Sequence, residues 1–125
     1  MKKIVLISPL LFLFLILFSC RRAGTGGDNT LVVFPKHHAT SVSGATVFVR
    51  FNAKDFPGST KADYDIQVDG EANEDHVHVK GLRKGNYFLY CTAFDSTISS
   101  LVSGGIAVTI SSKSGEKDID LPVTE

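Results

Sequence analysis

The sequence has few cysteines, no excess of basic residues and no sustained helical pattern, and each of these shortages excludes a class of protein. Its 13 basic and 13 acidic residues balance, and no stretch gathers Lys and Arg along one face. Proteins that bind nucleic acid usually carry such a face. We therefore expect no nucleic-acid partner, and we interpret Lys80, Arg83 and Lys84 as a solvated turn.

The two cysteines, Cys20 and Cys91, are too few and too differently placed for a disulfide framework. Cys20 follows an apolar leader, where we expect it to carry lipid. Cys91 shares the alternating row of Tyr87 and Leu89, so we expect it to be a small buried apolar side chain and not a nucleophile. We therefore expect no internal disulfide.

Catalytic signatures are missing as well. The sequence has no Gly-x-Ser-x-Gly nucleophile elbow, and no order of Ser, His and Asp to which a triad geometry can be assigned. We therefore expect a protein that is not an enzyme and that needs no cofactor.

Residues 1–19 have the pattern of a bacterial signal peptide. Lys2 and Lys3 precede an apolar run over residues 4–18, which is shorter than the roughly 20 residues that a spanning helix needs. The run ends in Leu17-Phe18-Ser19-Cys20, which resembles the lipobox of bacterial lipoproteins. The resemblance implies cleavage before Cys20 and acylation of that residue. Cleavage would leave 11 basic residues (13 minus the two lysines) against 13 acidic ones, a net charge of −2.

Several acyl chains on Cys20 would hold the protein firmly at a membrane. Arg21 and Arg22 follow, so an aspartate-type retention signal for the inner membrane is absent, as is an acidic surface-export run. We expect an outer-membrane lipoprotein of the cell envelope, facing the periplasm. Residues 20–29 would be the lipidated cysteine and a flexible tether, because residues 23–29 are small, polar and glycine-rich. Residues 30–125 would form one domain.

Apolar residues alternate with polar ones in most of the predicted domain, and this period of two indicates β-strands. Residues 77–95 read as a central hairpin that reverses over Gly81–Gly85. Segments 52–63 and 96–104 read as loops, with Phe56 plugging the end of the core, and Pro35 and Pro122 suggest edge positions. Strands are predicted over residues 30–38, 45–51, 64–68, 77–80, 87–93, 106–110 and 119–123.

These elements predict an all-β fold, an antiparallel Greek-key β-sandwich of about seven strands. No helix longer than two turns is expected after residue 30. Six side chains should be buried in its core: Val47, Val49, Leu82, Leu89, Val108 and Leu121.

Two sequence motifs carry a family resemblance. Ser43-Gly44-Ala45-Thr46-Val47 and Gly81-Leu82-Arg83-Lys84-Gly85-Asn86-Tyr87 resemble the paired signatures of the transthyretin-like, carboxypeptidase-regulatory-type domain, over roughly residues 31–123. The resemblance implies a prealbumin-like sandwich used for stability, docking or carbohydrate association. The chain also looks like small Bacteroidetes-type lipoproteins that share His-His, Phe-Pro-Gly, Tyr-Asp and Gly-Gly-Ile elements. Hydroxyisourate hydrolases of the transthyretin-like group end in Tyr-Arg-Gly-Ser, and this chain does not.

Histidines and acidic residues suggest metal sites. His76 and His78 lie two apart on a predicted strand and should share one face, with Glu74 or an acidic loop residue as a third ligand. His37 and His38 are adjacent and should point to opposite faces, so at most one of them can join the first pair. The six acidic residues between Asp63 and Asp75 could also suit calcium, but they do not match an EF-hand, and a solvated turn is the favoured interpretation.

The leading hypothesis is a lipid-anchored binding or interaction module of the cell envelope, with a protein or a glycan as its partner. Metal binding in the periplasm through His76 and His78 is the alternative. A cleft lined by aromatic rings and polar groups would favour a glycan, and a flat apolar patch would favour a protein. Residues for an exposed binding surface are His37, His38, Phe56, Tyr64 and Asp95, with Tyr90 and Phe94 as further candidates for stacking.

Overall fold

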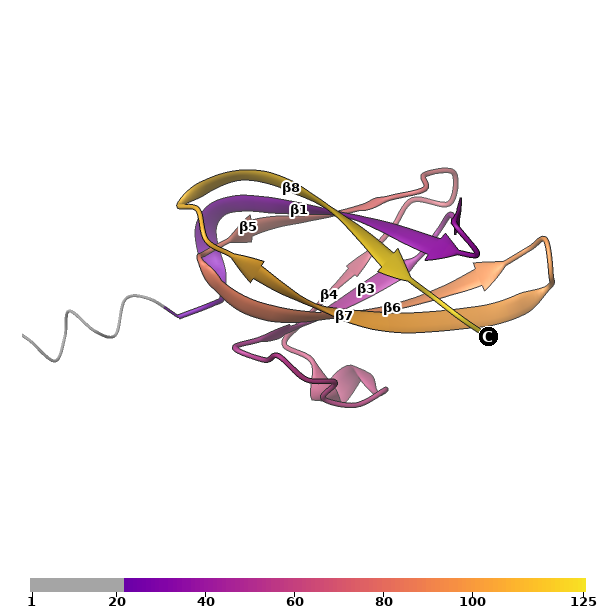
Figure 1. Ribbon diagram of the computed structural model, residues 1–125, viewed down its shortest axis with the longest axis horizontal. Coiled ribbons are helices and arrows are strands. Elements are labelled where there is room, and N and C mark those ends of the chain that lie inside the picture. Colours follow the sequence, from indigo (N-terminus) through magenta and orange to yellow (C-terminus); the bar gives the residue numbers. More distant parts are fainter. Residues whose placement is uncertain (1–21) are drawn as a thin grey trace, which may run out of the picture.

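Two four-stranded sheets with one shared core make up the part of the chain that the computed structural model describes, residues 22–125 (Figure 1). The first sheet contains β1 (Thr25–His37), β2 (Thr40–Ser41), β5 (Val77–Leu82) and β8 (Ser114–Pro122). The second sheet has the order β4 (Ile66–Asp69), β3 (Thr46–Phe51), β6 (Gly85–Asp95) and β7 (Ser100–Ile110). The predicted signal peptide and Cys20 lie outside the described residues.

Helical structure is limited, within residues 22–125, to one 3-10 turn at Lys61–Asp63 in the predicted loop 52–63. No helix in this part of the chain is long and apolar enough to cross a membrane. The predictions of an all-β fold and of no helix longer than two turns are therefore confirmed for the described residues. Residues 22–125 contain eight strands, one more than expected, because the two-residue β2 counts as a strand.

The core lies between the inner faces of the two sheets, and the six side chains predicted to be buried are all in it. The inward row Tyr87, Leu89, Cys91 and Ala93 of β6 is also buried, as its alternation predicted. The buried side chains from the two sheets form a single cluster, so the sheets share one core.

The predicted central hairpin is wrong. β5 pairs only with β1 in the first sheet, whereas β6 pairs with β3 and β7 in the second, so Arg83 and Lys84 carry the chain from one sheet to the other. Gly81 and Gly85 have φ angles of 74° and 148°, which β-branched or bulky residues rarely adopt. The alternation of apolar and polar residues shows that a strand has one buried face. Two strands that pair in one sheet and two strands that face each other across a core show the same alternation, so the pattern does not distinguish these arrangements.

The long hairpin of the fold is instead formed by β6 and β7, which pair from Gly85↔Ile110 to Asp95↔Ser100. The sequence predicts a loop over residues 100–104, because Gly104-Gly105 interrupts the apolar pattern, but these residues belong to β7. Both glycines lie within β7, at positions where neighbouring atoms leave no room for a side chain. A Cβ on Gly104 would clash with the Pro122 carbonyl oxygen, and one on Gly105 would meet the Phe88 ring at 2.6 Å.

β8 runs parallel to β1, so the sheets are not purely antiparallel as expected. Pro122 does end an edge strand, whereas Pro35 is buried in β1, which has β8 on one side and pairs with β5 and β2 along its length. Beyond β8 the chain reaches the second sheet. Thr124 exchanges two backbone hydrogen bonds of 2.8 Å with Ser103 of β7, which fixes the last residues against the β6–β7 hairpin.

The expected flexible tether over residues 23–29 is also wrong in its extent, because β1 begins at Thr25 and Ala23 is already buried. The Gly24 N–H donates to the Tyr87 hydroxyl at 2.9 Å, and that hydroxyl donates to the Arg83 carbonyl at 2.6 Å. Ala23 N–H donates to the Asn52 side chain at 3.2 Å. Glycine content thus marked a strand that passes close to other backbone and not a free linker.

Candidate functional site

β1 and β6 run in the same direction in opposite sheets, so the sandwich has an end where both begin and an end where both finish. We call the first the near end, marked by Gly24 and Tyr87, and the second the distal end, marked by His37 and Asp95. The distal end also carries the β6–β7 turn and the last residue, Glu125 (Figure 1). Two of the three buried polar or charged residues in the described part of the chain, His37 and Asp95, lie there.

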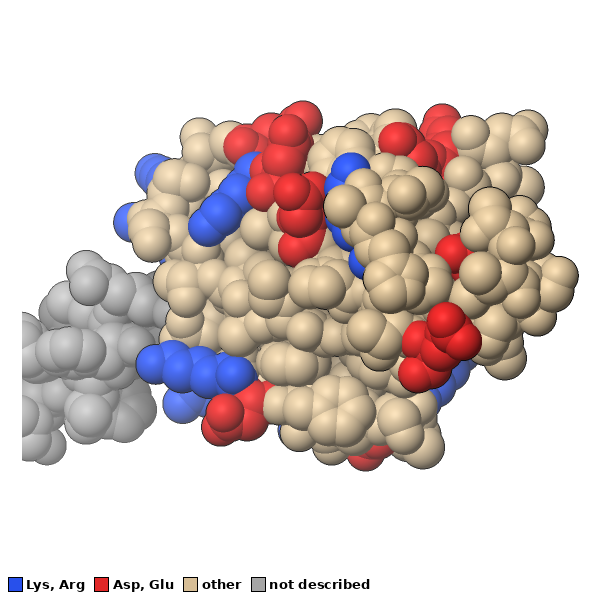
Figure 2. All heavy atoms as spheres, turned by 45° about the vertical axis from the view of Figure 1, so that its right-hand side comes forward, with Lys and Arg blue, Asp and Glu red and all other residues tan. Residues whose placement is uncertain are grey.

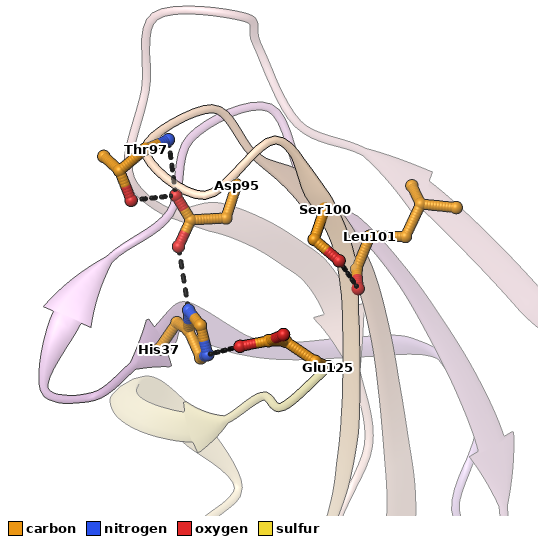
Figure 3. A network of polar contacts seen from close by, with 6 residues as sticks. All are labelled: His37, Asp95, Thr97, Ser100, Leu101 and Glu125. Carbon is orange, nitrogen blue, oxygen red and sulfur yellow. Dashed lines mark hydrogen bonds and ion pairs between the residues drawn. The ribbon is translucent and has the colours of Figure 1, made fainter.

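A buried histidine–carboxylate contact organises the distal end (Figure 3). His37 Nδ1 lies 2.8 Å from Asp95 Oδ2, and both residues are buried. The other Asp95 oxygen accepts from Thr97 N–H at 3.0 Å and from Thr97 Oγ1 at 2.6 Å. Hydrogen bonds from Thr97 and then from His37 hold the pKa of Asp95 below its ordinary value. An ionised Asp95 can only accept, so His37 Nδ1 carries the hydrogen and Nε2 faces away from Asp95.

Nε2 of His37 points toward Glu125, whose Oε1 lies 3.9 Å away (Figure 3). The His38 ring lies beside the His37 ring, with centroids 4.3 Å apart, so the prediction that the two point to opposite faces is wrong. The reason is the turn between β1 and β2. His38 and Ala39 have φ angles of 51° and 65°, and strand alternation ends where the backbone becomes left-handed.

A pocket of about 520 Å³ opens beside this contact. Its lining includes His37, His38, Asp95 and Thr97 together with the apolar Phe94 and Ile98. Phe94 and Ile98 are 54% and 43% exposed, and Leu101, which pairs with Phe94 across the hairpin, is 74% exposed. We call Phe94, Ile98 and Leu101 the apolar tip.

His76 and His78 do share a face, as predicted. Their ring centroids are 4.9 Å apart at the start of β5. His76 Nδ1 is engaged by Asp75 at 2.9 Å, and that hydrogen bond raises the pKa of His76. Glu74 is not brought within reach as a third ligand: within residues 22–125, the one cluster of three or more potential ligand side chains is His37, His38 and Glu125.

Four of the six acidic residues between Asp63 and Asp75 have hydrogen bonds to their own chain: Asp63, Asp65, Asp69 and Asp75. Asp63 accepts from Thr60, Asp69 accepts from Thr46 and Gln67, and these hydrogen bonds lower the pKa of both carboxyls. These carboxylates form turns and strand pairs, as the solvated-turn interpretation requires.

Phe56 does not plug the core, contrary to prediction. It is 57% exposed and lies on the outer face of the second sheet against Phe88 and Tyr90. Tyr64 stacks on Tyr90 there, with centroids 5.7 Å apart and planes 14° apart. The Tyr64 hydroxyl donates to the Gly58 carbonyl at 2.7 Å, and burial raises its pKa to about 12. This cluster anchors loop 52–63 to the sheet.

Cys91 is buried, and burial raises the pKa of its thiol to about 12. A thiol that stays protonated at neutral pH is a poor nucleophile. The prediction that Cys91 is a buried apolar side chain is confirmed.

Charged side chains of both signs are mixed on the surface. On the face drawn in Figure 2, acidic and basic groups alternate around a broad uncharged band. Arg22, Arg83, Lys84 and Lys113 line a hollow at the near end, where the chain enters the domain. The exposed Arg83 and Lys84 agree with the predicted solvated turn.

Comparison with known proteins adds no family to this description. The chain matches no protein-family model, no curated protein and no solved structure.

Of the five binding residues predicted from the sequence, the structure brings His37, His38 and Asp95 together and leaves Phe56 and Tyr64 on the outer sheet face. Sequence reasoning missed Glu125, Ile98 and Leu101. The signal that could have indicated the tip was three apolar residues, Phe94, Ile98 and Leu101, within eight positions of a segment rich in Ser and Thr. Glu125 had no local signal, because its position depends on the pairing of Thr124 with β7.

Proposed function

We propose that the protein is a lipid-anchored binding module of the cell envelope that presents its distal end to a protein partner and catalyses no reaction. The observation that carries the proposal is the apolar tip, in which Phe94, Ile98 and Leu101 project from one hairpin with 43% to 74% of their surface exposed. Exposed apolar residues that cluster mark interaction sites more often than scattered ones do.

A protein partner is favoured over a glycan by the chemistry of the exposed groups. The tip offers a phenyl ring and two aliphatic side chains, which have no hydrogen-bonding groups with which to select sugar hydroxyls. The tyrosines that could serve a sugar, Tyr64 and Tyr90, are half-buried beneath loop 52–63, and the Tyr64 hydroxyl is used within that loop. A carbohydrate-associated role, as the transthyretin-like resemblance implies, is therefore the second choice.

Anchoring through Cys20 would give the domain a defined orientation. Ala23 is buried, so only Arg21 and Arg22 separate it from Cys20, and three peptide steps span at most about 11 Å. The near end would then lie against the membrane, with Arg83, Lys84 and Lys113 toward lipid headgroups. The tip would point away from it, and the periplasmic face of the outer membrane is the location we propose.

The prealbumin-like Greek-key topology and a relation to Bacteroidetes-type lipoproteins belong to the same proposal. Two sheets of four strands, rich in antiparallel pairs, support a sandwich of this general kind. The parallel β1–β8 pair is the feature that departs from the antiparallel sandwich that the resemblance implies.

Labelling and cross-linking test the two parts separately. The wild-type chain should incorporate labelled fatty acid and remain protected from external protease in intact cells, and Cys20→Ser should abolish the label. Release of unlabelled wild-type chain into the medium would refute the anchor.

A photo-reactive residue placed at Phe94 or at Leu101 should give the same discrete cross-linked protein in intact cells. Phe56 is the matched control, because it is an equally exposed aromatic residue on another surface. The same product from position 56, or no discrete product from either tip position, would contradict a partner at the tip. If soluble glycans protect the Tyr90 ring from chemical modification, and no cross-linked protein is found, the carbohydrate alternative is favoured.

A further inference from the structure

The distal end brings together three potential metal ligands from two parts of the chain that are far apart in sequence. A ring nitrogen of His37, a ring nitrogen of His38 and a carboxylate oxygen of Glu125 all lie within 4.8 Å of one another. His37 ends β1, His38 lies in the turn that follows, and Glu125 is held nearby by the pairing of Thr124 with β7. Only the fold brings Glu125 to the two histidines.

His37 is held as metal-binding histidines commonly are. Its Nδ1–H donates to Asp95, and Asp95 is fixed in turn by two hydrogen bonds from Thr97 (Figure 3). A carboxylate on one ring nitrogen fixes the tautomer and makes the other nitrogen a better ligand. Here the other nitrogen, Nε2, is the one directed at Glu125, 3.9 Å away.

The backbone around His38 supports the same conclusion. His38 and Ala39 are both left-handed, at φ 51° and 65°, in a two-residue turn that usually takes Asn or Gly. Residues other than Gly in this region carry strain, which often occurs where a side chain has a task. In this turn, the left-handed conformation brings the His38 ring against the His37 ring.

We propose that His37, His38 and Glu125 bind a divalent transition metal ion of the zinc type, with Asp95 and Thr97 positioning His37. Two imidazoles and one carboxylate are a common zinc set, and they leave a fourth position open to water or to a ligand from a partner. Tetrahedral zinc places its ligand atoms about 3.3 Å apart. The exposed side chains of His38 and Glu125 can close the remaining distance, while the buried His37 stays in place.

The site differs from the pair predicted from the sequence. His76 and His78 are near each other, but Asp75 occupies Nδ1 of His76 and no third ligand joins them in the described part of the chain. A double variant of His76 and His78 is therefore a control that removes the same number of imidazoles from a neighbouring surface.

Zinc titration of the full chain, purified in detergent without a histidine tag, tests whether His37, His38 and Glu125 bind the metal. We expect one zinc ion per chain with a dissociation constant in the micromolar range or tighter at pH 7.5. His38→Ala and Glu125→Gln change exposed side chains and should each weaken binding at least tenfold. Asp95→Asn should weaken it by about 10- to 100-fold through His37. The His76→Ala, His78→Ala double variant should bind as the wild type does.

Cobalt gives a second readout, because cobalt bound to nitrogen and oxygen in a tetrahedral site has intense visible absorption. That spectrum should be present in the wild type and the double variant, and should disappear in Glu125→Gln. Circular dichroism of each variant checks that the fold is retained. Absence of zinc binding, binding unchanged in both His38→Ala and Glu125→Gln, or binding lost in the double variant would each overturn the proposal.

Discussion

At the near end of the sandwich the Tyr87 hydroxyl joins β6 to the start of β1, and at the distal end Asp95 joins β6 to the end of β1 through His37. Both contacts link the same two strands across the two sheets. The near contact uses a phenol and backbone groups, which keep their charge state at ordinary pH. The distal contact uses an ionised carboxylate and an imidazole, whose other nitrogen faces a second carboxylate.

The difference suggests that the two ends have different tasks. At the near end the Tyr87 hydroxyl satisfies backbone groups of Gly24 and Arg83, which is a structural role. A histidine that lies between two carboxylates is more than closure requires, and it is the arrangement on which the proposed metal site rests. The near end therefore has contacts that close the core, and the distal end is where the proposed binding site lies.

The largest loss of stability is expected from a substitution in the core between the two ends. Leu89 lies midway along β6 and is fully buried. Leu89→Ala should lower the free energy of unfolding by about 2–5 kcal/mol, because it leaves a cavity in packed surroundings. Urea denaturation measures this loss. A change below 1 kcal/mol would show that β6 does not face the shared core.

Tyr87→Phe tests the near end. It removes the hydroxyl that accepts from buried Gly24 N–H and donates to Arg83, so the free energy of unfolding should fall by about 1–3 kcal/mol. The loss should be the same at pH 5 and pH 8, and zinc binding should not change. Tyr64→Phe is the matched control, because its hydroxyl serves a surface loop, and it should cost less. An equal or greater loss in Tyr64→Phe would contradict the role of Tyr87.

Asp95→Asn tests the distal end and should show a dependence on pH. The folded pKa of Asp95 is lowered, so its ionised form contributes stability above the unfolded pKa of about 3.9, and this contribution is lost as pH falls through the lower folded value. Asp95→Asn should therefore be less stable than wild type at pH 6, and the gap should close toward pH 2. Urea denaturation across this range measures it. If the difference in unfolding free energy between Asp95→Asn and wild type does not change with pH, the negative charge of Asp95 is not the source of the stability.

The smallest effect is expected at the exposed pair of Asp75 and His76, which makes the same kind of contact as Asp95 and His37 but in solvent. The Asp75 hydrogen bond raises the pKa of His76, so stability from this contact is present below the unfolded pKa of His76 while Asp75 is ionised, and it is lost as pH rises through the raised folded value. In an NMR titration Asp75→Asn should shift the pKa of His76 downward, with little change in unfolding. An unchanged His76 pKa would show that the contact is absent in solution.

The sequence by itself determined the fold class and most of the core, because alternation records which side of each strand meets water. It correctly placed Val47, Leu89 and Leu121 inside, and it paired His76 with His78 because both lie near one strand. It also identified His37, His38 and Asp95 as binding candidates, but it gave them no common site.

Only the tertiary structure decided which strands pair and which residues meet at the distal end. Alternation is identical for strands that pair and strands that face each other, so β5 and β6 could not be assigned to separate sheets. Glycines looked like breaks in β7 because the Pro122 backbone and the Phe88 ring that require them lie far away in sequence. His37 meets Asp95 and Glu125 across 58 and 88 positions, through strand pairing and a left-handed turn that local patterns do not record.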